Sequence, residues 1–367
     1  MNASRETKTF DSDHAAEAGR LIPDGELVVF PTETVYGLGA NALDPDACRR
    51  LFAAKGRPAD NPLIVHFSDL GSLEAAFPRL DTRARALLAA FSPGPLSVIV
   101  PKAEAASWCR ISDVATAGLD TVAIRIPRHP VAAGFLRAAG VPVAAPSANL
   151  SGRPSPTTFE MARADMEGRV AAIIDGGDCE YGLESTVIEV RPGAVRILRH
   201  GVVTDAMVRS VLRNGDATVE PTGTMLAGKS GTPRSPGMKY AHYKPSARVV
   251  AVDTARLRSA QTAVMLRRLA QEAGTESGLL GVIRIAQRPG IAARREEWSG
   301  GRAVVEDNIL TVVVESSEEY ARDLYRLFVW FDAQGAGAII AELPEPSGTG
   351  IAVRDRLTKA SGGQVMS

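Results

Sequence analysis

Short apolar runs alternate with polar, turn-rich segments through the amino-terminal half of the chain. GELVVF at 25–30, PLIVHF at 62–67 and TVAIRI at 121–126 are each bounded by turn-forming residues, which is typical of buried β-strands. Further strands are predicted at 96–101, 141–145, 170–175, 185–190 and 195–199, and helices at 44–54, 82–91 and 158–166. Many short strands with helices between them favour an α/β fold with a twisted mixed sheet and flanking helices.

The pattern changes after Asn214. Residues 221–245 read PTGTMLAGKSGTPRSPGMKYAHYKP, and this scarcity of apolar periodicity predicts a long linker. Beyond it, strands are predicted at 248–252, 279–285, 310–314 and 338–342, and helices at 256–273, 318–334 and 351–360. This β-α-β alternation predicts a small doubly wound, Rossmann-like α/β domain. We therefore predict a first domain over 1–215, a linker over 216–246 and a second domain over 247–367.

Composition excludes several classes of protein. At 367 residues, with 45% hydrophobic and 23% charged residues, the chain is long enough for two globular domains. Formal net charge is zero, so no bulk field draws it to nucleic acid or to an anionic membrane, and neither stable nucleic-acid binding nor membrane association is expected. Three cysteines without a CxxC pair predict a reducing compartment and no structural zinc, and no apolar signal or span is present. We expect a soluble, cytoplasmic protein.

Two blocks near the amino end carry the candidate chemistry: PTETVYGLGANA at 31–42 and KGRPADNPLIVH at 55–66. In the second block Lys55 and Arg57 flank Gly56 just after a predicted helix. Two such close cations repel one another unless an anion joins them, and the planar fork of arginine suits phosphate. Taken alone, however, the same residues fit a glycine C-cap with cations at a helix terminus. Both interpretations stay open at this point.

Other polar residues stand where apolar runs end. Arg125 interrupts TVAIRI, and a buried guanidinium needs a carboxylate or an anionic ligand. Ser147 and Asn149 lie in a third block, APSANLSGRPSPT at 145–157, which is rich in turn residues and hydrogen-bond donors. Small polar residues at the ends of several strands indicate one cleft.

One further motif is expected to be a chance match. GTMLAGKS at 223–230, which contains Lys229, satisfies the pattern of a phosphate-binding loop. That loop works between a strand and a helix whose amino end faces the phosphates, whereas GTPRSPG follows here and cannot start a helix cleanly. The sequence also shows no metal-ligand cluster, no nucleophile–histidine arrangement and no alternation of basic and aromatic residues.

The three blocks, with SPGPLSVIV, TVAIRIPRHP, GLESTVIEV and SPGMKYAHYKP, resemble the threonylcarbamoyl-AMP synthases of the YrdC-like family in their longer two-domain form. The resemblance extends over nearly the whole chain. It departs from the family pattern at Ser92, Ser97 and His200, none of which is assigned to the chemistry. The family joins L-threonine, bicarbonate or CO2, and ATP into threonylcarbamoyl-AMP and pyrophosphate. A separate tRNA-modifying transferase then uses the adenylate.

The resemblance implies a set of site residues. For threonine it implies Thr34, His66, Arg125, Ala145 and Ser185. For ATP it implies Lys55, Arg57, Asn61, Thr121, Ser147, Asn149, Ser155, Arg199 and, from the linker, Tyr240 or Tyr243. Lys55 and Arg57 are also the expected catalytic residues. No protein-held metal is expected, because Mg²⁺ arrives with ATP and is held largely by phosphates and water.

Two other classes of protein remain alternatives. YrdC-like modules also occur in hydrogenase-maturation proteins that make a carbamoyl adenylate, but those carry acylphosphatase and zinc-finger regions that this chain lacks. An RNA-binding or ribosome-assembly protein of the same fold is the second alternative, because a local basic patch is compatible with zero net charge.

Overall fold

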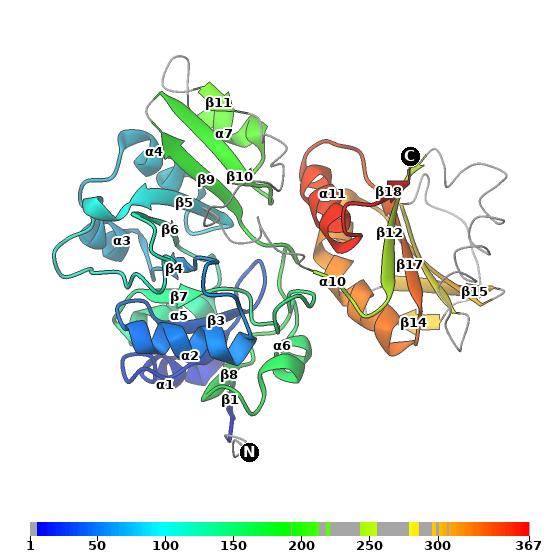
Figure 1. Ribbon diagram of the computed structural model, residues 1–367, viewed down its shortest axis with the longest axis horizontal. Helices are drawn as coiled ribbons and strands as arrows, with labels where there is room; N and C mark the ends of the chain where they lie inside the picture. The colour runs from blue at the N-terminus through cyan, green and yellow to red at the C-terminus, as the bar shows by residue number, and fades with distance from the viewer. Residues whose placement is uncertain are drawn as a thin grey trace. The chain divides into compact units, whose positions relative to one another are not determined.

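The computed structural model describes residues 6–191, 193–212, 218–220, 243–254, 279–285, 296–298, 301–306 and 308–366. The chain forms two compact units (Figure 1). The first comprises Met1–Ser151 and Ser155–Tyr240, and the second Gly152–Pro154 and Ala241–Ser367. The predicted boundaries at 215 and 246 stay predictions, because most of 213–242 lies outside the described residues.

The first unit is built on an eleven-stranded mixed sheet with strand order β1-β8-β2-β3-β7-β4-β6-β5-β9-β10-β11. Its strands are β1 (Lys8–Phe10), β2 (Val28–Phe30), β3 (Gly37–Asn41), β4 (Ile64–His66), β5 (Leu96–Pro101), β6 (Thr121–Arg125), β7 (Val143–Ala145), β8 (Ala172–Ile174), β9 (Thr186–Arg191), β10 (Ala194–Arg199) and β11 (Thr218–Glu220). Its α-helices are α1 (Ala15–Gly19), α2 (Pro45–Lys55), α3 (Leu70–Ala76), α4 (Thr82–Phe91), α5 (Pro130–Ala139), α6 (Phe159–Met166) and α7 (Asp205–Val211), with 3₁₀ turns η1 (Ser12–His14) and η2 (Lys102–Glu104).

Two apolar cores cover this sheet. Helices α2, α3, α4, α6 and α7 contribute side chains to the larger core, together with alternate residues of the central strands. Helices α1 and α5 pack on β2, β7 and β8 in a second core. A small separate cluster joins one residue from each of five strands: Ile64, Ile99, Ala123, Val187 and Leu198. This cluster matters for the site, because it lies on the sheet face opposite to the larger core.

Local signals explain the helix that positions the candidate cations. The side chain of Asp44 accepts a hydrogen bond from the Asp46 amide (2.8 Å), and Pro45 occupies the first helical position of α2. The helix ends at Gly56, whose φ of 60° and ψ of 34° are left-handed. The predicted glycine C-cap is therefore confirmed.

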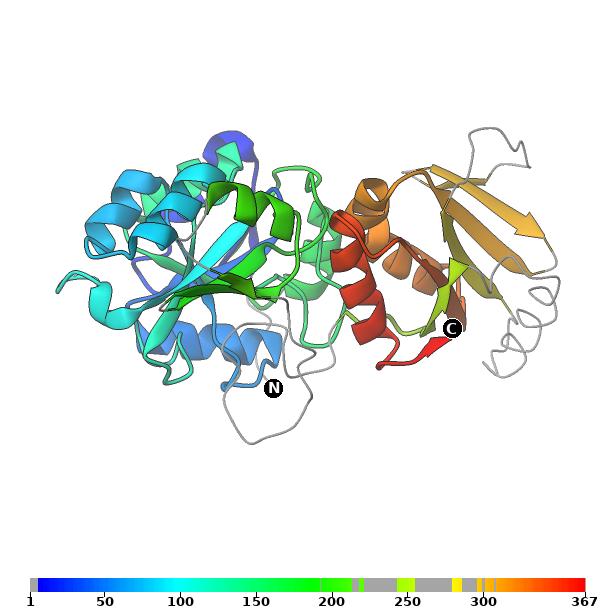
Figure 2. The same cartoon turned by 90° about the horizontal axis from the view of Figure 1, so that it is seen from above.

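The second unit is a seven-stranded sheet with order β14-β15-β16-β13-β17-β12-β18. Its described elements are β12 (Arg248–Asp253), β13 (Leu280–Ile285), β14 (Glu296–Trp298), β15 (Gly301–Glu306), β16 (Ile309–Val314), β17 (Ala338–Leu343), β18 (Val365–Met366), α10 (Ser317–Ala333) and α11 (Thr349–Ala360). Strands β16, β13, β17, β12 and β18 are parallel, whereas β14 and β15 form an antiparallel extension. Figure 2 shows α10 and α11 side by side against this sheet. The helix predicted at 256–273 lies outside the described residues.

The sequence missed several elements for identifiable reasons. Strand β3 has the sequence GLGAN, and its two glycines favour a turn over a strand when only the sequence is considered. Helix α5 (PVAAGFLRAA) begins at Pro130, the second proline of RIPRHP, and two prolines so close together favour a turn when only the sequence is considered. In the part of the chain that the structure describes, no helix has the length and apolarity to cross a bilayer. Cys48, Cys109 and Cys179 are all buried and free.

Candidate active site

One face of the central sheet carries most of the predicted polar residues. Val65, Val122 and Ile188 enter the larger core, so their neighbours Ile64, Ala123 and Val187 point to the opposite face. Strand alternation puts several polar residues on this same opposite face: His66 on β4, Thr121 and Arg125 on β6, Ser97 on β5, and Ser185 just before β9. The sheet thus brings together side chains that lie far apart in the sequence.

Arg125 lies at the end of β6 and is only 4% exposed. Its Nη2 donates to Glu33 Oε1 at 2.7 Å and to Thr34 Oγ1 at 2.9 Å, and its Nε donates to the Gly94 carbonyl at 3.4 Å. Thr34 is held in turn by the Thr32 hydroxyl, which lies 2.9 Å from Thr34 Oγ1. The partner that a buried guanidinium requires is therefore Glu33, which is 1% exposed and belongs to the turn between β2 and β3.

His66 is adjacent to Arg125 in the parallel pairing of β4 and β6. Burial, with the nearby Arg125 charge as the second cause, lowers the pKa of His66 to about 3, so the imidazole is neutral at physiological pH. Its Nδ1 lies 3.1 Å from the Ile64 carbonyl oxygen and therefore carries the proton. The backbone of Val143, which is paired with His66 on the neighbouring strand β7, also interacts with the ring.

Ser185 and Arg199 are connected by hydrogen bonds. Arg199 donates to Ser185 through Nε to the carbonyl (3.0 Å) and through Nη2 to the hydroxyl (3.1 Å). The Ser185 and Ser97 hydroxyls lie 2.8 Å apart. A register shift in β10 places both Leu198 and Arg199 opposite Val187. Such a β-bulge interrupts the regular alternation of side chains and changes the direction in which the arginine points.

Lys55, the last residue of α2, is 2% exposed, and its Nζ donates to the carbonyl oxygens of Ser147 and Asn149. Burial, reinforced by Arg57, holds the pKa of Lys55 well below its usual range, while Asp165 opposes the shift. The turn that it holds is closed by a bond from the Ser147 hydroxyl to Asn149 Oδ1 (2.5 Å). Lys55 therefore fixes the turn that carries two other predicted ATP residues.

Arg57 lies just past the helix cap and braces the following loop. It donates through Nε to the Asn61 carbonyl and through Nη2 to the Pro62 carbonyl, both at 3.2 Å. The Asn61 side chain is 1% exposed, yet neither Oδ1 nor Nδ2 has a hydrogen-bond partner among the described residues. Buried polar atoms without partners are rare, so this amide is a candidate ligand contact.

The remaining predicted residues occupy separate places. Ser155 is buried, and its hydroxyl donates to Glu184 Oε1 at 2.6 Å. Ala145 ends β7 opposite Ile64. Thr121 begins β6, four residues from Arg125, which puts the two about 13 Å apart along the strand.

The structure describes one of the two linker tyrosines. Tyr243 is buried in the second unit, where its ring stacks on Tyr325 at a centroid distance of 5.3 Å and lies 5.6 Å from the Arg356 guanidinium. Tyr240 lies outside the described residues.

Sequence reasoning overlooked Glu33, Ser97 and Glu184 as site residues. Each contacts a predicted residue: Glu33 binds Arg125, Ser97 lies against Ser185, and Glu184 binds Ser155. The sequence did indicate that a residue such as Glu33 was needed, because a buried Arg125 requires a carboxylate or an anionic ligand as its partner. Only the fold could reveal which one, since 92 residues separate the pair.

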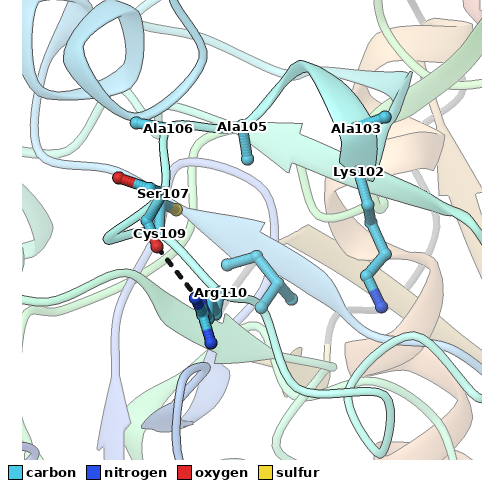
Figure 3. Close-up of a pocket in the computed structure, with 8 residues that line it drawn as sticks. Lys102, Ala103, Ala105, Ala106, Ser107, Cys109 and Arg110 are labelled. Atoms are coloured by element: carbon cyan, nitrogen blue, oxygen red, sulfur yellow. Dashed lines mark hydrogen bonds between the residues drawn. The ribbon is translucent and has the colours of Figure 1, made fainter.

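A cavity of about 310 Å³ lies elsewhere on the first unit (Figure 3). It is lined by the segment after β5, from Lys102 to Ile111, and the Arg110 side chain folds back to donate to the Ser107 carbonyl at 3.3 Å. No predicted site residue lines it.

Comparison with known proteins places this fold and site in a family. The Sua5_yciO_yrdC family model, described as "Telomere recombination", matches residues 20–201, and a model described as "Threonylcarbamoyl-AMP synthase, C-terminal domain" matches residues 203–362. The chain is 39% identical over 350 residues to a threonylcarbamoyl-AMP synthase of Pyrococcus abyssi, covering 95% of this chain and 94% of the relative. It is also 39% identical over 352 residues to that of Bacillus subtilis, covering 96% and 94%.

A solved structure agrees over the full length. The crystal structure of P. abyssi Sua5 complexed with L-threonine has a TM-score of 0.81 and 35% sequence identity, covering 99% of each chain. These matches define a two-domain α/β nucleotide-handling enzyme. The chain belongs to the Sua5/YrdC family, the family of the threonylcarbamoyl-AMP synthases.

Proposed function

We propose that this chain is an L-threonylcarbamoyl-AMP synthase, which forms threonylcarbamoyl-AMP and pyrophosphate from L-threonine, bicarbonate or CO2, and ATP. One observation carries the proposal beyond family membership. The turn between β2 and β3 joins a buried Arg125–Glu33 pair to the turn held by Lys55. The Tyr36 amide donates to the Pro156 carbonyl (2.9 Å), and the Ala148 amide donates to the Tyr36 carbonyl (2.8 Å). In this proposal the subsite for threonine, a small zwitterion, adjoins the subsite for ATP, a polyanion.

The proposed chemistry fits what the residues offer. A carbamate oxygen formed from the threonine amino group attacks the α-phosphorus of ATP, and pyrophosphate leaves. The protein has to position the two reactants and offset developing negative charge, which needs cations and hydrogen-bond donors rather than a covalent nucleophile. Lys55 and Arg57 supply those charges in this proposal, and neutral His66 lines the threonine subsite.

We assign the threonine subsite to Thr34, His66, Arg125, Ala145 and Ser185. We assign the ATP subsite to Lys55, Arg57, Asn61, Thr121, Ser147, Asn149, Ser155 and Arg199, with a linker tyrosine, Tyr240 or Tyr243, closing over the nucleotide. The unpartnered amide of Asn61 and the hydroxyls of Ser147 and Ser155 support the second assignment.

Mg²⁺ enters this proposal as part of the substrate. Among the described residues no group of three or more His, Cys, Asp or Glu side chains is placed to hold a metal ion, and the proposed ATP subsite consists of cations, amides and hydroxyls. Cations and N–H donors bind phosphate oxygens, so we propose that the ion is held largely by the phosphates and water. We further propose a cytoplasmic enzyme whose product is consumed by a tRNA-modifying transferase.

The direct test is pyrophosphate release from Mg·ATP and bicarbonate, measured with each common amino acid in turn. Release that requires both threonine and bicarbonate is the expected result. Release that requires neither would indicate a generic ATPase. No release, combined with salt-sensitive RNA binding, would favour the RNA-binding alternative instead.

A further inference from the structure

Glu33 has one carboxylate oxygen that the fold leaves unused. Its side chain is 1% exposed, and Oε1 accepts the 2.7 Å hydrogen bond from Arg125. Oε2 is buried, with no hydrogen-bond partner in the described structure. A buried carboxylate oxygen without a donor is unfavourable, because burial removes its hydrogen bonds to water and no protein hydrogen bond replaces them. The molecule therefore presents an acceptor that a bound ligand can satisfy.

The charges around this oxygen define what kind of ligand fits. Arg125 pairs with Glu33 from β6, while Arg128, His129 and Tyr181 approach Glu33 closely enough to interact with its charge. Arg128 is already committed to Glu180, at 2.7 Å, on the surface. His129 forms no described hydrogen bond with Glu33, and burial lowers its pKa, so it is not a cationic partner. The position is suited to a positively charged donor that comes with the substrate.

A free amino acid carries its ammonium and its carboxylate on the same carbon atom. A buried Arg–Glu pair presents the complementary charges side by side, here 2.7 Å apart. Matching both charges of a zwitterion avoids leaving either one desolvated and unpaired, which is the costly outcome in a buried site.

We propose that Glu33 is a specificity-determining residue that holds the α-ammonium group of L-threonine through Oε2, while Arg125 holds the carboxylate. The assignment rests on the proposed function and deepens it, because it names the group that distinguishes an amino acid from a hydroxy acid. The other oxygen, Oε1, fixes Arg125 beside Thr34. In this assignment Glu33 both contacts the substrate through Oε2 and positions Arg125 through Oε1.

Binding of two ligands to one variant tests this assignment. The ligands are L-threonine and its α-hydroxy analogue, 2,3-dihydroxybutyrate, which keeps the carboxylate and the β-hydroxyl but has no amino group. Calorimetry on the full-length protein is expected to give threonine about 10- to 100-fold tighter binding than the analogue, the usual size of one charged hydrogen bond. In Glu33→Gln the preference should fall to about 3-fold or less, with the affinity for the analogue nearly unchanged.

Glu189→Gln is the matched control, because Glu189 is also a buried glutamate paired with an arginine, Arg191 at 2.6 Å, and is not among the residues assigned to either subsite. It should keep the full preference. If Glu33→Gln does not fold, Glu33→Asp keeps the charge at a shorter reach and should retain a preference intermediate between the other two.

Several results would overturn the assignment. Equal weakening of both ligands in Glu33→Gln would mean that Glu33 acts only through Arg125, since both ligands use that arginine. An unchanged preference would exclude any contact with the ammonium group. A wild-type protein that binds neither ligand would remove the proposed function itself, an outcome that is distinct from the other two.

Discussion

Lys55 and Arg57 are one residue apart, yet the structure gives them different surroundings. Lys55 is buried, and its ammonium group closes the turn at Ser147 and Asn149, whereas Arg57 lies past the helix cap and donates to the carbonyl groups of Asn61 and Pro62. We expect Lys55→Ala and Arg57→Ala each to reduce threonine-dependent pyrophosphate release by about 100-fold or more, as for other charge-stabilising groups. Lys55→Ala should also lower the free energy of unfolding, by about 1–3 kcal/mol, because Lys55 is buried and two backbone carbonyls lose their donor.

Urea unfolding of both variants separates the two effects. In the sequence the two cations look alike, and it is the burial of Lys55 that leads to an expected loss of stability. Wild-type activity in either variant would remove its catalytic assignment. Unaltered stability of Lys55→Ala would show that the turn holds without the ammonium group.

His66 gives a pH-dependent prediction. Its pKa of about 3 in the folded protein is below the usual value of 6.5, so between these values the unfolded chain binds more protons than the folded one. Stability therefore rises with pH across this window and is lost as the solution is acidified below about pH 6.5. For one such histidine the loss between pH 6.5 and 5 is about 1.5 kcal/mol.

The variant His66→Gln isolates this contribution. Its unfolding free energy should depend less steeply on pH over that interval, by about the same 1.5 kcal/mol. His129, whose pKa burial also lowers, is present in both proteins and cancels in the comparison. Parallel pH profiles for the two proteins would show that His66 has the same pKa in the folded and unfolded states, contrary to its surroundings.

The junction between strands β9 and β10 shows how elements, rather than single residues, place Ser185. Gly201 follows β10 in the sequence and lies close to the start of β9 in space. A Cβ added at Gly201 would lie 2.5 Å from the Thr186 amide nitrogen and 2.7 Å from the Glu184 carbonyl oxygen. Gly201→Ala must push the two segments apart, and we expect it to cost about 1–3 kcal/mol of stability, as overpacking does. It should also weaken threonine binding.

A second glycine provides the control. In α5, Gly134 has no atom within 4 Å of an added Cβ, so Gly134→Ala should raise the free energy of unfolding by about 0.5–1 kcal/mol through helix propensity alone. Thermal unfolding of both variants, with threonine titrations on each, measures the contrast. Equal stability of the two variants would contradict the tight approach at Gly201.

Sequence patterns predicted most of the elements but not how their residues meet. The apolar runs at 96–101 and 121–126 and the capped helix at 82–91 were recognisable, because periodicity and local caps are properties of contiguous residues. Strand β3 (GLGAN) is not predicted from the sequence, because its two glycines have no side chains to contribute to an alternating pattern. The Arg125–Glu33 pair and the bulge that redirects Arg199 depend on strand order and register, which only the folded sheet determines.

Across the whole molecule, the chain offers two candidate places for phosphate. One is assembled from the end of α2 and the turn at Ser147, and the other is the contiguous match GTMLAGKS that contains Lys229. The second lies outside the described residues, so the argument for or against it is chemical. A phosphate-binding loop needs a helix that starts directly after it, and GTPRSPG does not start one.

We therefore expect Lys229→Ala to keep pyrophosphate release within about 2-fold of wild type, while Arg57→Ala loses about 100-fold or more. The measurement is threonine-dependent release over a range of ATP concentrations, which separates an effect on KM for ATP from one on kcat. An unchanged KM for ATP in Lys229→Ala would leave the end of α2 and the turn at Ser147 as the phosphate site. A rise in KM for ATP as large as that of Arg57→Ala would instead make the segment at 223–230 a working part of the site, and the chance-match interpretation would be wrong.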